Sequence, residues 1–359
     1  MQLKIAILGT RGIPNNHGGY EQFAEFFAKY LVEKGYETYV YNSSLHPFKK
    51  NLWNGVHIIH KYDPEDKIGT AGQFIYDLNC VLDIRKRNID VVFQLGYTSS
   101  SVWNWLIPKH IKLITNMDGL EWKRSKYSKK VQNFLQYAEK LAIKHSSVLI
   151  ADSIGIKEYL KRKYAVDSEY IAYGVETKNE YNDSILKELD IIKHEYNMLI
   201  ARIEPENNIE VILDGVIQSE NKQDFVVIGS VENTFGKYLV KKFKKYKQIK
   251  FIGSIYNLPK LNSLRKNSNI YFHGHSVGGT NPSLLEAMAS FSLICSHDNI
   301  FNKSILGKNA FYFKNKNDVA KVVETENIKS SQSMIEQNYN HVVRDFNWKT
   351  INRKYEQLI

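Results

Sequence analysis

Residues 273–289 read HGHSVGGTNPSLLEAMA and place a glycine-rich loop between an apolar run, Ile270–His273, and a helical segment. Asn281 suits the N-cap of that helix and Pro282 its first position, because asparagine accepts a backbone N–H there and proline lacks the N–H that would stay free. A short apolar run, a glycine-containing loop and a helix form the repeating unit of a parallel sheet covered on both faces. The stretch therefore predicts an α/β fold.

The same alternation extends in both directions from this stretch. In the second half of the chain it predicts strands at 198–201, 225–229, 250–253, 270–273, 292–296 and 310–313, and helices at 208–218, 236–246, 260–266, 282–289 and 318–323. In the first half it predicts strands at 4–9, 38–41, 56–60, 90–94, 112–116 and 148–151, and helices at 20–34, 72–87 and 131–144. We therefore expect two doubly wound, Rossmann-like α/β domains and a terminal helical stretch over 333–358.

A polar stretch without periodicity, residues 176–196, separates the two series. We interpret it as a linker between a first domain, residues 1–175, and a second domain, residues 197–340. Ligands of doubly wound sheets bind beyond the carboxyl ends of the strands. Two such domains that face each other form a cleft, and we expect the active site there.

The composition excludes several classes of protein. With 43% apolar and 24% charged residues in 359, the chain is typical of a folded soluble protein rather than a collagen-like or disordered one. No run approaches the roughly 20 apolar residues that cross a bilayer, and the N-terminus has no signal-peptide pattern, which favours a cytoplasmic location. Cys80 and Cys295 are too few and too far apart for a disulfide framework or a zinc site.

The net charge of +11 indicates an anionic partner. Nucleic acid, an acidic membrane surface and a phosphorylated ligand all fit that charge. The cations gather in two runs, one of lysines between 237 and 250 and one formed by Lys123, Arg124, Lys126, Lys129 and Lys130. Either run fits a solvated helix face. The second run follows the aromatic segment 103–107, and it also fits attachment to anionic lipid if the two segments share a face.

A second glycine-rich loop, residues 9–21, reads GTRGIPNNHGGYE. Its glycines are not spaced as G-x-G-x-x-G, and the second strand ends at Tyr41-Asn42-Ser43 without an acid to hold a ribose, so we do not expect NAD. Gly18 and Gly19 stand at the start of the first helix, where free backbone N–H groups let an anionic or sugar ligand approach. A long surface turn would need the same glycines.

The helix that begins at Pro282 offers a site for a diphosphate. Its positive N-terminus follows Gly278-Gly279, which leave backbone N–H groups accessible, and this contact needs no metal. Glu286 lies one turn further on, where a carboxylate accepts two hydrogen bonds from a ribose diol. His273 and His275 at the preceding strand end fit either a ligand role or a structural one.

Two further segments follow predicted strands. Arg202 offers a bidentate fork for phosphate oxygens, with an ion pair to Glu204 or Glu206 as the alternative. Asp118 and Glu121 lie in the first domain, where a base or a carboxylate that stabilises an oxocarbenium ion is useful. Either carboxylate also fits the cap of a helix.

Together these segments resemble a GT-B glycosyltransferase of the retaining family-four type, and more narrowly its bacterial rhamnosyltransferase-like branch with a DUF1972-like N-terminal domain. The resemblance covers almost the whole chain. It implies two Rossmann-like domains that face each other across a cleft, and a C-terminal helix within 341–359 that crosses back to the first domain. It rests on GGYE at 18–21, NMDGLEWKR at 116–124, Arg202 with Pro205-Glu206, GGTNPSLLE at 278–286 and FNW at 346–348.

The resemblance also implies roles for residues. It places the nucleotide sugar on the second domain, Arg202 on the diphosphate and Glu286 on the ribose, and it makes Asp118, Glu121 and Arg202 the catalytic candidates. Two positions depart from the family pattern, since Gly278 replaces a glutamate that contacts the donor sugar and Asn207 replaces a phosphate-binding lysine. From the two loops and the resemblance together, the donor-binding residues that we expect are Gly18, Gly19, Arg202, Gly278, Gly279, Thr280, Asn281, Ser283, Leu284 and Glu286.

The function that the resemblance implies is transfer of a sugar, L-rhamnose or a hexose or hexosamine, with retention of configuration. The donor is a nucleoside-diphosphate sugar, the acceptor a polyprenyl-diphosphate-linked glycan of surface polysaccharide biosynthesis, and neither a metal nor a further cofactor takes part. We expect a cytoplasmic protein, peripheral at the anionic inner face of the plasma membrane.

Two rival functions remain open from the residues alone. A sugar-nucleotide epimerase of GT-B fold would share the cleft but need no membrane face. A nucleic-acid-binding protein would account for the charge but needs base-stacking aromatics, whereas Tyr238, Phe243 and Tyr246 of the lysine-rich run fit the core side of a helix. We therefore expect no nucleic-acid partner.

Overall fold

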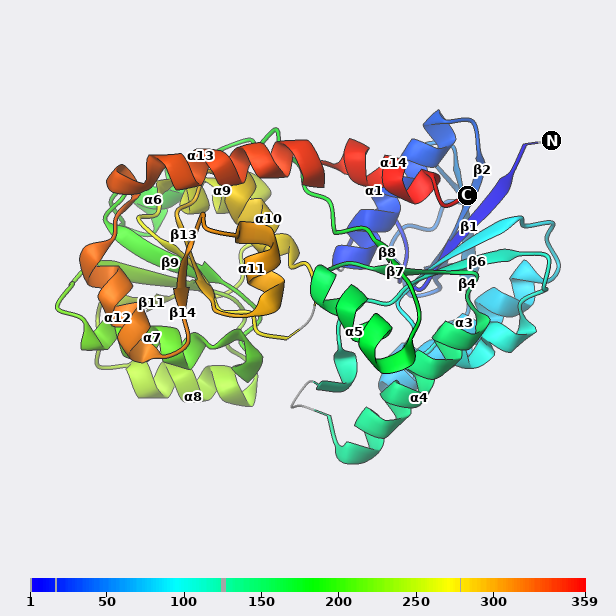
Figure 1. The fold of residues 1–359 in the computed structure, drawn as a ribbon, viewed down its shortest axis with the longest axis horizontal. Helices are drawn as coiled ribbons and strands as arrows, with labels where there is room; N and C mark the ends of the chain where they lie inside the picture. Colours follow the sequence, from blue (N-terminus) through cyan, green and yellow to red (C-terminus); the bar gives the residue numbers. More distant parts are fainter. Residues whose placement is uncertain (1, 17, 124–126, 278) are drawn as a thin grey trace. The chain divides into compact units, whose positions relative to one another are not determined.

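The computed structural model describes residues 2–16, 18–123, 127–277 and 279–359. The chain forms two compact units (Figure 1). The first comprises Met1–Tyr173 together with Trp348–Ile359, and the second comprises Gly174–Asn347. The segment expected as a linker, 176–196, therefore counts with the second unit, and the C-terminal residues count with the first.

An eight-stranded sheet forms the centre of the first unit. Its strand order is β3-β4-β2-β1-β5-β6-β7-β8, and every pairing is parallel except that of β3 with β4. Apart from the two short edge strands, this is the order of a doubly wound sheet with its switch point between β1 and β5. The strands are β1 (Lys4–Leu8), β2 (Glu37–Ser43), β3 (Leu52–Trp53), β4 (Val56–Lys61), β5 (Val91–Leu95), β6 (Lys112–Asn116), β7 (Val148–Ala151) and β8 (Glu169–Tyr170).

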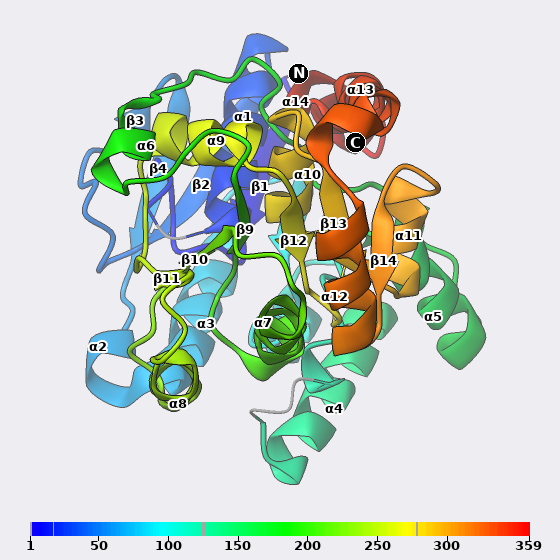
Figure 2. The same cartoon turned by 90° about the vertical axis from the view of Figure 1, so that its left-hand side faces the viewer.

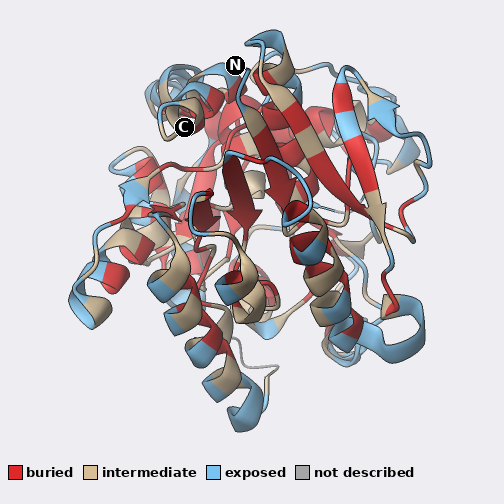
Figure 3. Cartoon of the chain, turned by 90° about the vertical axis from the view of Figure 1, so that its right-hand side faces the viewer, coloured by how far each residue is buried: buried red, intermediate tan, exposed pale blue. Residues whose placement is uncertain are grey.

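Strand β1 illustrates why this sheet is covered on both faces. Successive side chains of a strand point to opposite faces. Ile5 and Ile7 belong to a buried cluster with residues of the first helix, whereas Ala6 and Leu8 belong to another with Tyr76 and other residues of the third helix. Figure 3 shows the central strands of this unit as mostly buried and its helices with many exposed or partly exposed residues. An uninterrupted apolar run thus supplies both cores.

The helices of the first unit connect these strands. They are α1 (Gly19–Glu33), α2 (Glu65–Ile68), α3 (Gly72–Ile84), α4 (Lys129–His145), α5 (Ile154–Tyr164) and α14 (Trp348–Glu356), with short 3-10 turns η1 (Gly69–Ala71), η2 (Ser101–Leu106) and η3 (Glu121–Lys123).

Helix α14 completes the core of the first unit. Trp348, Ile351 and Tyr355 are buried in the same cluster as residues of α1. The Trp348 ring stacks on Phe26 with the ring centroids 4.6 Å apart, and the Tyr355 hydroxyl accepts a hydrogen bond from Asn116 Nδ2 at 2.8 Å. The amphipathic C-terminal segment is therefore held by apolar burial and by polar contacts, among them that of Tyr355 with Asn116.

A six-stranded sheet forms the centre of the second unit. Its order is β11-β10-β9-β12-β13-β14 and all its pairings are parallel. In chain order this is 3-2-1-4-5-6, the order of a doubly wound fold, with the switch point between β9 and β12. The strands are β9 (Tyr196–Ile200), β10 (Asp224–Ile228), β11 (Ile249–Phe251), β12 (Tyr271–His273), β13 (Ile294–His297) and β14 (Phe311–Phe313).

The helices of the second unit pack closely, and Figure 2 shows α7 beside α12. A Cβ on Gly215 of α7 would lie 2.5 Å from the Val319 Cβ of α12, so only glycine permits this approach. The helices are α6 (Ser184–Glu188), α7 (Ile209–Gln218), α8 (Thr234–Phe243), α9 (Leu258–Asn267), α10 (Pro282–Ala289), α11 (Ile300–Leu306), α12 (Lys316–Thr325) and α13 (Gln332–His341), with 3-10 turns η4 (Pro205–Asn207) and η5 (Ile328–Ser331) and a π-helical turn η6 (Val342–Phe346).

The strands and helices predicted from the sequence are all present, with ends shifted by at most three residues. The predicted terminal helical stretch is interrupted at Asn347, whose backbone is extended. The sequence pattern missed the two edge strands β3 and β8 and the helices α2, α5, α6 and α11.

Candidate functional site

Two loops of the second unit meet at the switch point between β9 and β12. The loop after β9 carries Arg202, and the loop after β12 leads into α10. Because β9 and β12 are parallel neighbours, both loops leave the same edge of the sheet. Asn208 Nδ2 donates a hydrogen bond to the Gly274 carbonyl oxygen at 2.8 Å, and Ser276 Oγ donates to the Glu206 carbonyl oxygen at 2.7 Å. The two loops are thus fastened to each other.

The close contact between the two loops requires glycine at position 274. A Cβ built on Gly274 would lie 1.9 Å from the carbonyl oxygen of Asn207, so any other residue would push the loops apart. Asn207 is buried, donates from Nδ2 to the Arg202 carbonyl oxygen at 2.7 Å, and places Oδ1 2.9 Å from His275 Nδ1. Where the resemblance leads one to expect a phosphate-binding lysine, this chain has an amide that braces the loop of Arg202.

The Arg202 side chain itself is exposed. Over the described part of the chain it forms no ion pair, so the alternative of a pair with Glu204 or Glu206 is not realised. An exposed guanidinium keeps its charge at any physiological pH and presents several N–H donors. Arg202 is therefore available to a ligand at the switch point.

The start of α10 is built as the sequence predicts. Asn281 caps the helix, since its Oδ1 accepts a hydrogen bond from the Ser283 N–H at 2.9 Å, and Pro282 is the first helical residue. The first turn contains no acidic side chain that would offset the positive helix end. Thr280 is buried, Gly279 is partly exposed, and the predicted donor-side residue Gly278 lies outside the described residues.

Two of the predicted donor-side residues face protein. The Ser283 Oγ atom lies 2.6 Å from the Tyr271 hydroxyl, within hydrogen-bond distance. Leu284 is fully buried, and its apolar side chain belongs to the interior of the unit. Both side chains contact other residues of the second unit. A ligand would therefore contact Ser283 or Leu284 only through the backbone or by displacing a neighbouring side chain.

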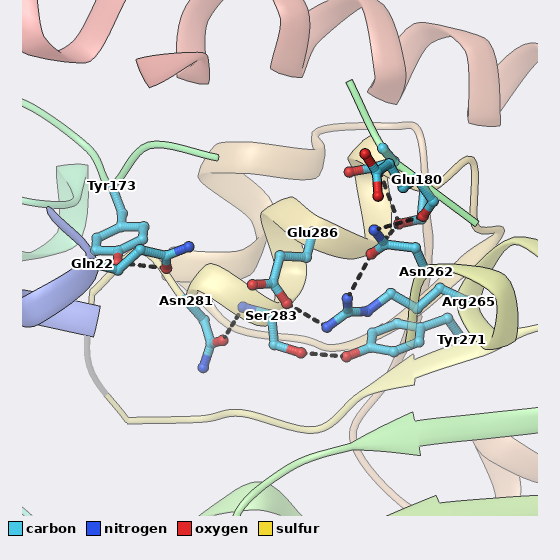
Figure 4. Close-up of polar contacts among 11 residues, drawn as sticks. Gln22, Tyr173, Glu180, Asn262, Arg265, Tyr271, Asn281, Ser283 and Glu286 are labelled. Atoms are coloured by element: carbon cyan, nitrogen blue, oxygen red, sulfur yellow. Dashed lines mark hydrogen bonds and ion pairs between the residues drawn. The ribbon is translucent and has the colours of Figure 1, made fainter. Parts of the chain in front are cut away.

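Glu286 forms an ion pair with Arg265 of α9, a residue that the sequence did not single out. Arg265 donates from Nη2 to the Glu286 Oε2 atom and from Nη1 to Asn262 Oδ1 at 3.3 Å, as Figure 4 shows. The Arg265 side chain is 1% exposed, whereas that of Glu286 is 24% exposed. The carboxylate thus stands between a buried cation and the surface.

Histidines gather at the ends of β12 and β13. His273 is buried and has no hydrogen-bond partner for Nε2 among the described residues. Burial, together with the nearby His275 and His297, lowers the pKa of His273 to about 3. His273 is therefore a neutral side chain at the edge of the sheet, whereas His275 pairs with Asn207.

In the first unit, the predicted glycines lie at the beginning of α1. Gly18 is the N-cap and Gly19 the first helical residue. The Tyr173 hydroxyl lies within hydrogen-bond distance of the Gly19 carbonyl oxygen and 3.0 Å from Gln22 Oε1, a contact drawn in Figure 4. The helix start is therefore positioned by an aromatic side chain as well as by its glycines.

Asp118 lies near this helix start. Its backbone is left-handed with φ of 49°, and its N–H donates to Asn116 Oδ1 at 2.9 Å. Burial first, and then the negative charges of Asp118 and Asp152, raise the pKa of Tyr20, the second residue of α1. The structure thus brings Asp118 close to Tyr20. Asp118 stands three residues before η3 and does not cap a helix.

Asp152 belongs to the same site and was missed. It follows β7 as Asp118 follows β6, and the two strands are parallel neighbours. The position after a predicted strand was the signal that could have found it. Glu121, the other carboxylate predicted in this unit, begins η3 and contributes with Glu139 and Asp118 to the raised pKa of Tyr97, whose main cause is burial.

No group of three or more histidine, cysteine, aspartate or glutamate side chains placed to hold a metal ion occurs among the described residues. Within the same described ranges, no helix combines the length and the apolar character that a membrane crossing requires.

Comparison with known proteins supports the class of the fold. Residues 2–176 match the family model described as "Domain of unknown function (DUF1972)". No curated protein matches the sequence. The chain is similar to the solved structure of sucrose-phosphate synthase from Thermosynechococcus elongatus, with 15% identity over 99% of this chain and 98% of that chain and a TM-score of 0.79. It is also similar to HepE from Anabaena in complex with UDP and glucose, with 16% identity over 99% of this chain and 99% of that chain and a TM-score of 0.77.

A further structure, α,α-trehalose 6-phosphate synthase from Burkholderia multivorans, is similar at 9% identity over 99% of this chain and 98% of that chain, with a TM-score of 0.72. At these identities the likeness concerns the fold. The chain has the GT-B fold, with two parallel-sheet α/β domains, and the fold class expected from the sequence is confirmed.

Proposed function

We propose that the protein is a glycosyltransferase that takes a sugar from a nucleoside-diphosphate donor. The observation that carries this proposal is the pairing of an exposed arginine, Arg202, with the capped and acid-free start of α10 on adjoining loops of one switch point. Both features attract phosphate. The similar structures of HepE hold UDP and glucose in one case and UDP-glucose in another, which supports a nucleotide sugar as the ligand.

The chemistry of the transfer is release of a diphosphate. As the bond between the sugar C1 and the phosphate oxygen breaks, negative charge develops on that oxygen, and donors placed around it lower the barrier. We assign this task to Arg202 and to the N–H groups at the start of α10. No metal is needed for this stabilisation, because a fixed guanidinium and a helix N-terminus supply positive charge.

For the acceptor side we propose Asp118 and Glu121 of the first unit. The resemblance of the sequence implies transfer with retention, in which the acceptor attacks from the face of the leaving group. A carboxylate near that face stabilises the cationic sugar and orients the acceptor hydroxyl. Asp118 is the better placed of the two, since it lies beside the start of α1 and near Asp152.

A lipid-linked glycan acceptor, as in surface polysaccharide biosynthesis, is proposed from the outer surface of the first unit. Trp105 of η2 is 64% exposed, and exposed apolar residues Ile75, Leu82, Val131 and Tyr137 lie on α3 and α4. The Trp103 Nε1 atom donates to the Phe74 carbonyl oxygen at 2.8 Å, and η2 also packs against α4, so these residues share one neighbourhood.

Lys129 and Lys130 begin α4 and are exposed, while Arg124 and Lys126 of the same run lie outside the described residues. We call the surface formed by Ile75, Leu82, Trp105, Val131, Tyr137, Lys129 and Lys130 the basic-aromatic surface. Cations beside exposed aromatics suit the interface of an anionic bilayer. We therefore propose peripheral attachment at the cytoplasmic face of a membrane.

For the transferred sugar we propose L-rhamnose, a hexose or a hexosamine, as the resemblance of the sequence implies.

The proposal is tested by a thermal-shift screen with UDP, GDP and dTDP, followed by their sugars. A ligand that binds only the folded state raises the melting temperature in proportion to RT ln(1 + [L]/Kd). We expect one nucleoside diphosphate to raise it at micromolar to millimolar concentration and the matching nucleoside to have a smaller effect. If none of the three shifts the melting temperature, the protein is not a transferase that uses these donors.

A further inference from the structure

Arg265 is among the largest fully buried side chains of the molecule, and none of the roles assigned so far uses it. It lies on α9 and extends to α10, where its Nη2 donates to Glu286 Oε2. Its other terminal nitrogen donates to Asn262 Oδ1 at 3.3 Å, and Asn262 Nδ2 donates in turn to the Glu180 carbonyl oxygen at 3.3 Å (Figure 4). The guanidinium is therefore oriented by a second buried side chain.

A guanidinium in this position must have an anion beside it. Arginine does not lose its proton at any physiological pH, and a buried charge without a partner is strongly unfavourable. Among the residues that the structure describes, Glu286 is the only carboxylate paired with Arg265. The buried guanidinium thus depends on the Glu286 carboxylate of α10 as its counter-ion.

The same contact fixes which part of the carboxylate faces outward. An ionised carboxylate has two oxygens with about four acceptor sites. Arg265 occupies Oε2, whereas Oε1 has no hydrogen-bond partner within the described part of the chain, and the side chain is partly exposed. Arg265 and Asn262 therefore hold an acceptor oxygen in one orientation, one turn from the helix start proposed to bind the diphosphate.

We propose that Arg265 is a positioning residue for the nucleoside: it holds the Glu286 carboxylate in one orientation, so that its free oxygen accepts hydrogen bonds from the hydroxyls of the donor's pentose. This inference rests on the proposed function, because it concerns the same donor. It separates two tasks, since Arg202 recognises the diphosphate and the Arg265–Glu286 pair recognises the pentose.

The test measures hydroxyl discrimination by calorimetry. The probes are UDP with its 2′-deoxy and 3′-deoxy forms, or dTDP with 3′-deoxy-dTDP if the screen selects thymidine. Loss of a hydrogen bond to a charged group corresponds to about 10–100-fold in affinity, so the wild type should prefer the intact pentose by about that factor. In Arg265→Met the preference should fall to within about threefold of unity, and in Arg265→Lys, which keeps the charge but not the fork, it should be intermediate.

Two comparisons exclude a general loss of structure. Arg202→Ala should weaken binding of inorganic diphosphate yet keep the preference for the intact pentose. Arg265→Met should bind inorganic diphosphate like the wild type but lose that preference. Arg344→Met, at an exposed arginine of the same unit, should leave both unchanged. Thermal unfolding without ligand is measured for each variant. If Arg265→Met does not fold, Arg265→Lys and Asn262→Ala are compared with the wild type instead, because both change the orientation of the carboxylate while a cation remains beside it.

The outcomes separate this inference from the proposed function. If the wild type binds no nucleoside diphosphate, the proposed function fails. If the wild type binds but does not discriminate the deoxy forms, or if the Arg265 variants bind all forms more weakly by one common factor, the function stands and the positioning role of Arg265 is refuted.

Discussion

The Arg265 guanidinium is held against the Glu286 carboxylate, 21 residues further along the chain, and only the carboxylate reaches the surface. The residue expected to bind a pentose is therefore also the counter-ion of a buried cation. Any experiment that changes Glu286 alters the stability of the second unit as well as its ligand site, and the two effects have to be measured separately.

The first prediction concerns this coupling. Glu286→Gln should lower the free energy of unfolding by about 3–5 kcal/mol, because it leaves the Arg265 charge buried without an anion. Urea denaturation of the ligand-free protein measures the change. The double variant Arg265→Met/Glu286→Gln should be destabilised by less than the sum of the two single variants, since it removes both charges. Additive losses would show that the pair is not energetically coupled.

The second prediction concerns Arg202. Arg202→Ala should weaken binding of a nucleoside diphosphate by about 10–100-fold, because charge-assisted hydrogen bonds to phosphate are lost, and should leave binding of the nucleoside nearly unchanged. Titration calorimetry with both ligands gives the ratio, and Arg344→Ala serves as the control for loss of an exposed positive charge. An equal effect on nucleoside and nucleoside diphosphate would refute the assignment of Arg202 to the phosphate.

The third prediction concerns His273 and pH. Burial lowers the pKa of His273 to about 3, whereas an unfolded histidine titrates near 6.5. Between these values the unfolded chain binds a proton that the folded chain does not, so stability is highest above about pH 6.5 and falls as the pH falls. The contribution of this residue is about 1.4 kcal/mol per pH unit. His273→Gln should unfold in urea with a correspondingly weaker dependence on pH between 6 and 5, and an unchanged slope would contradict a buried neutral His273.

The fourth prediction concerns the basic-aromatic surface. Sedimentation with vesicles that contain phosphatidylglycerol should bring down the wild type at low salt, and Lys129→Glu/Lys130→Glu should reduce the partition coefficient by at least tenfold, because each lysine near an anionic surface contributes about 1 kcal/mol. Trp105→Ser should reduce it further. Tyr256, an aromatic residue of the second unit that is 91% exposed, provides the control Tyr256→Ser. Equal sedimentation of all these variants would remove the membrane from the proposal.

The strands of both units were predicted because most of them contain a short run of apolar residues, such as Ile5–Leu8 in β1 and Phe225–Ile228 in β10. Residues 112–116 and 148–151 coincide with β6 and β7, and the start of α10 follows from Asn281 and Pro282. Strand β3 escaped because its two residues, Leu52 and Trp53, are too few to show a period. Helix α11 escaped because its seven residues are too few to show a clear helical period and its N-cap, Asn299, lies two residues after β13.

The site was predictable only where chemistry and position in the chain coincide. Arg202, Asp118 and Glu286 each follow a recognisable strand or helix start, and local rules find them. Arg265 lies in the sequence LRKN, where an arginine fits a solvated helix surface, and only packing of α9 against α10 reveals that it is buried. Local pattern therefore locates residues that lie at element ends, whereas pairing between elements distant in sequence depends on tertiary structure.

Helix α14 lies in the first unit although 174 residues of the second unit precede it in the chain. During synthesis the first unit must therefore wait, without Trp348 and Tyr355 in its core, until the second has left the ribosome. The apolar residues of α1 that pack against Trp348 and Tyr355 stay uncovered until then, where chaperones or proteases reach the nascent chain, and a truncation near residue 347 would destabilise the first unit.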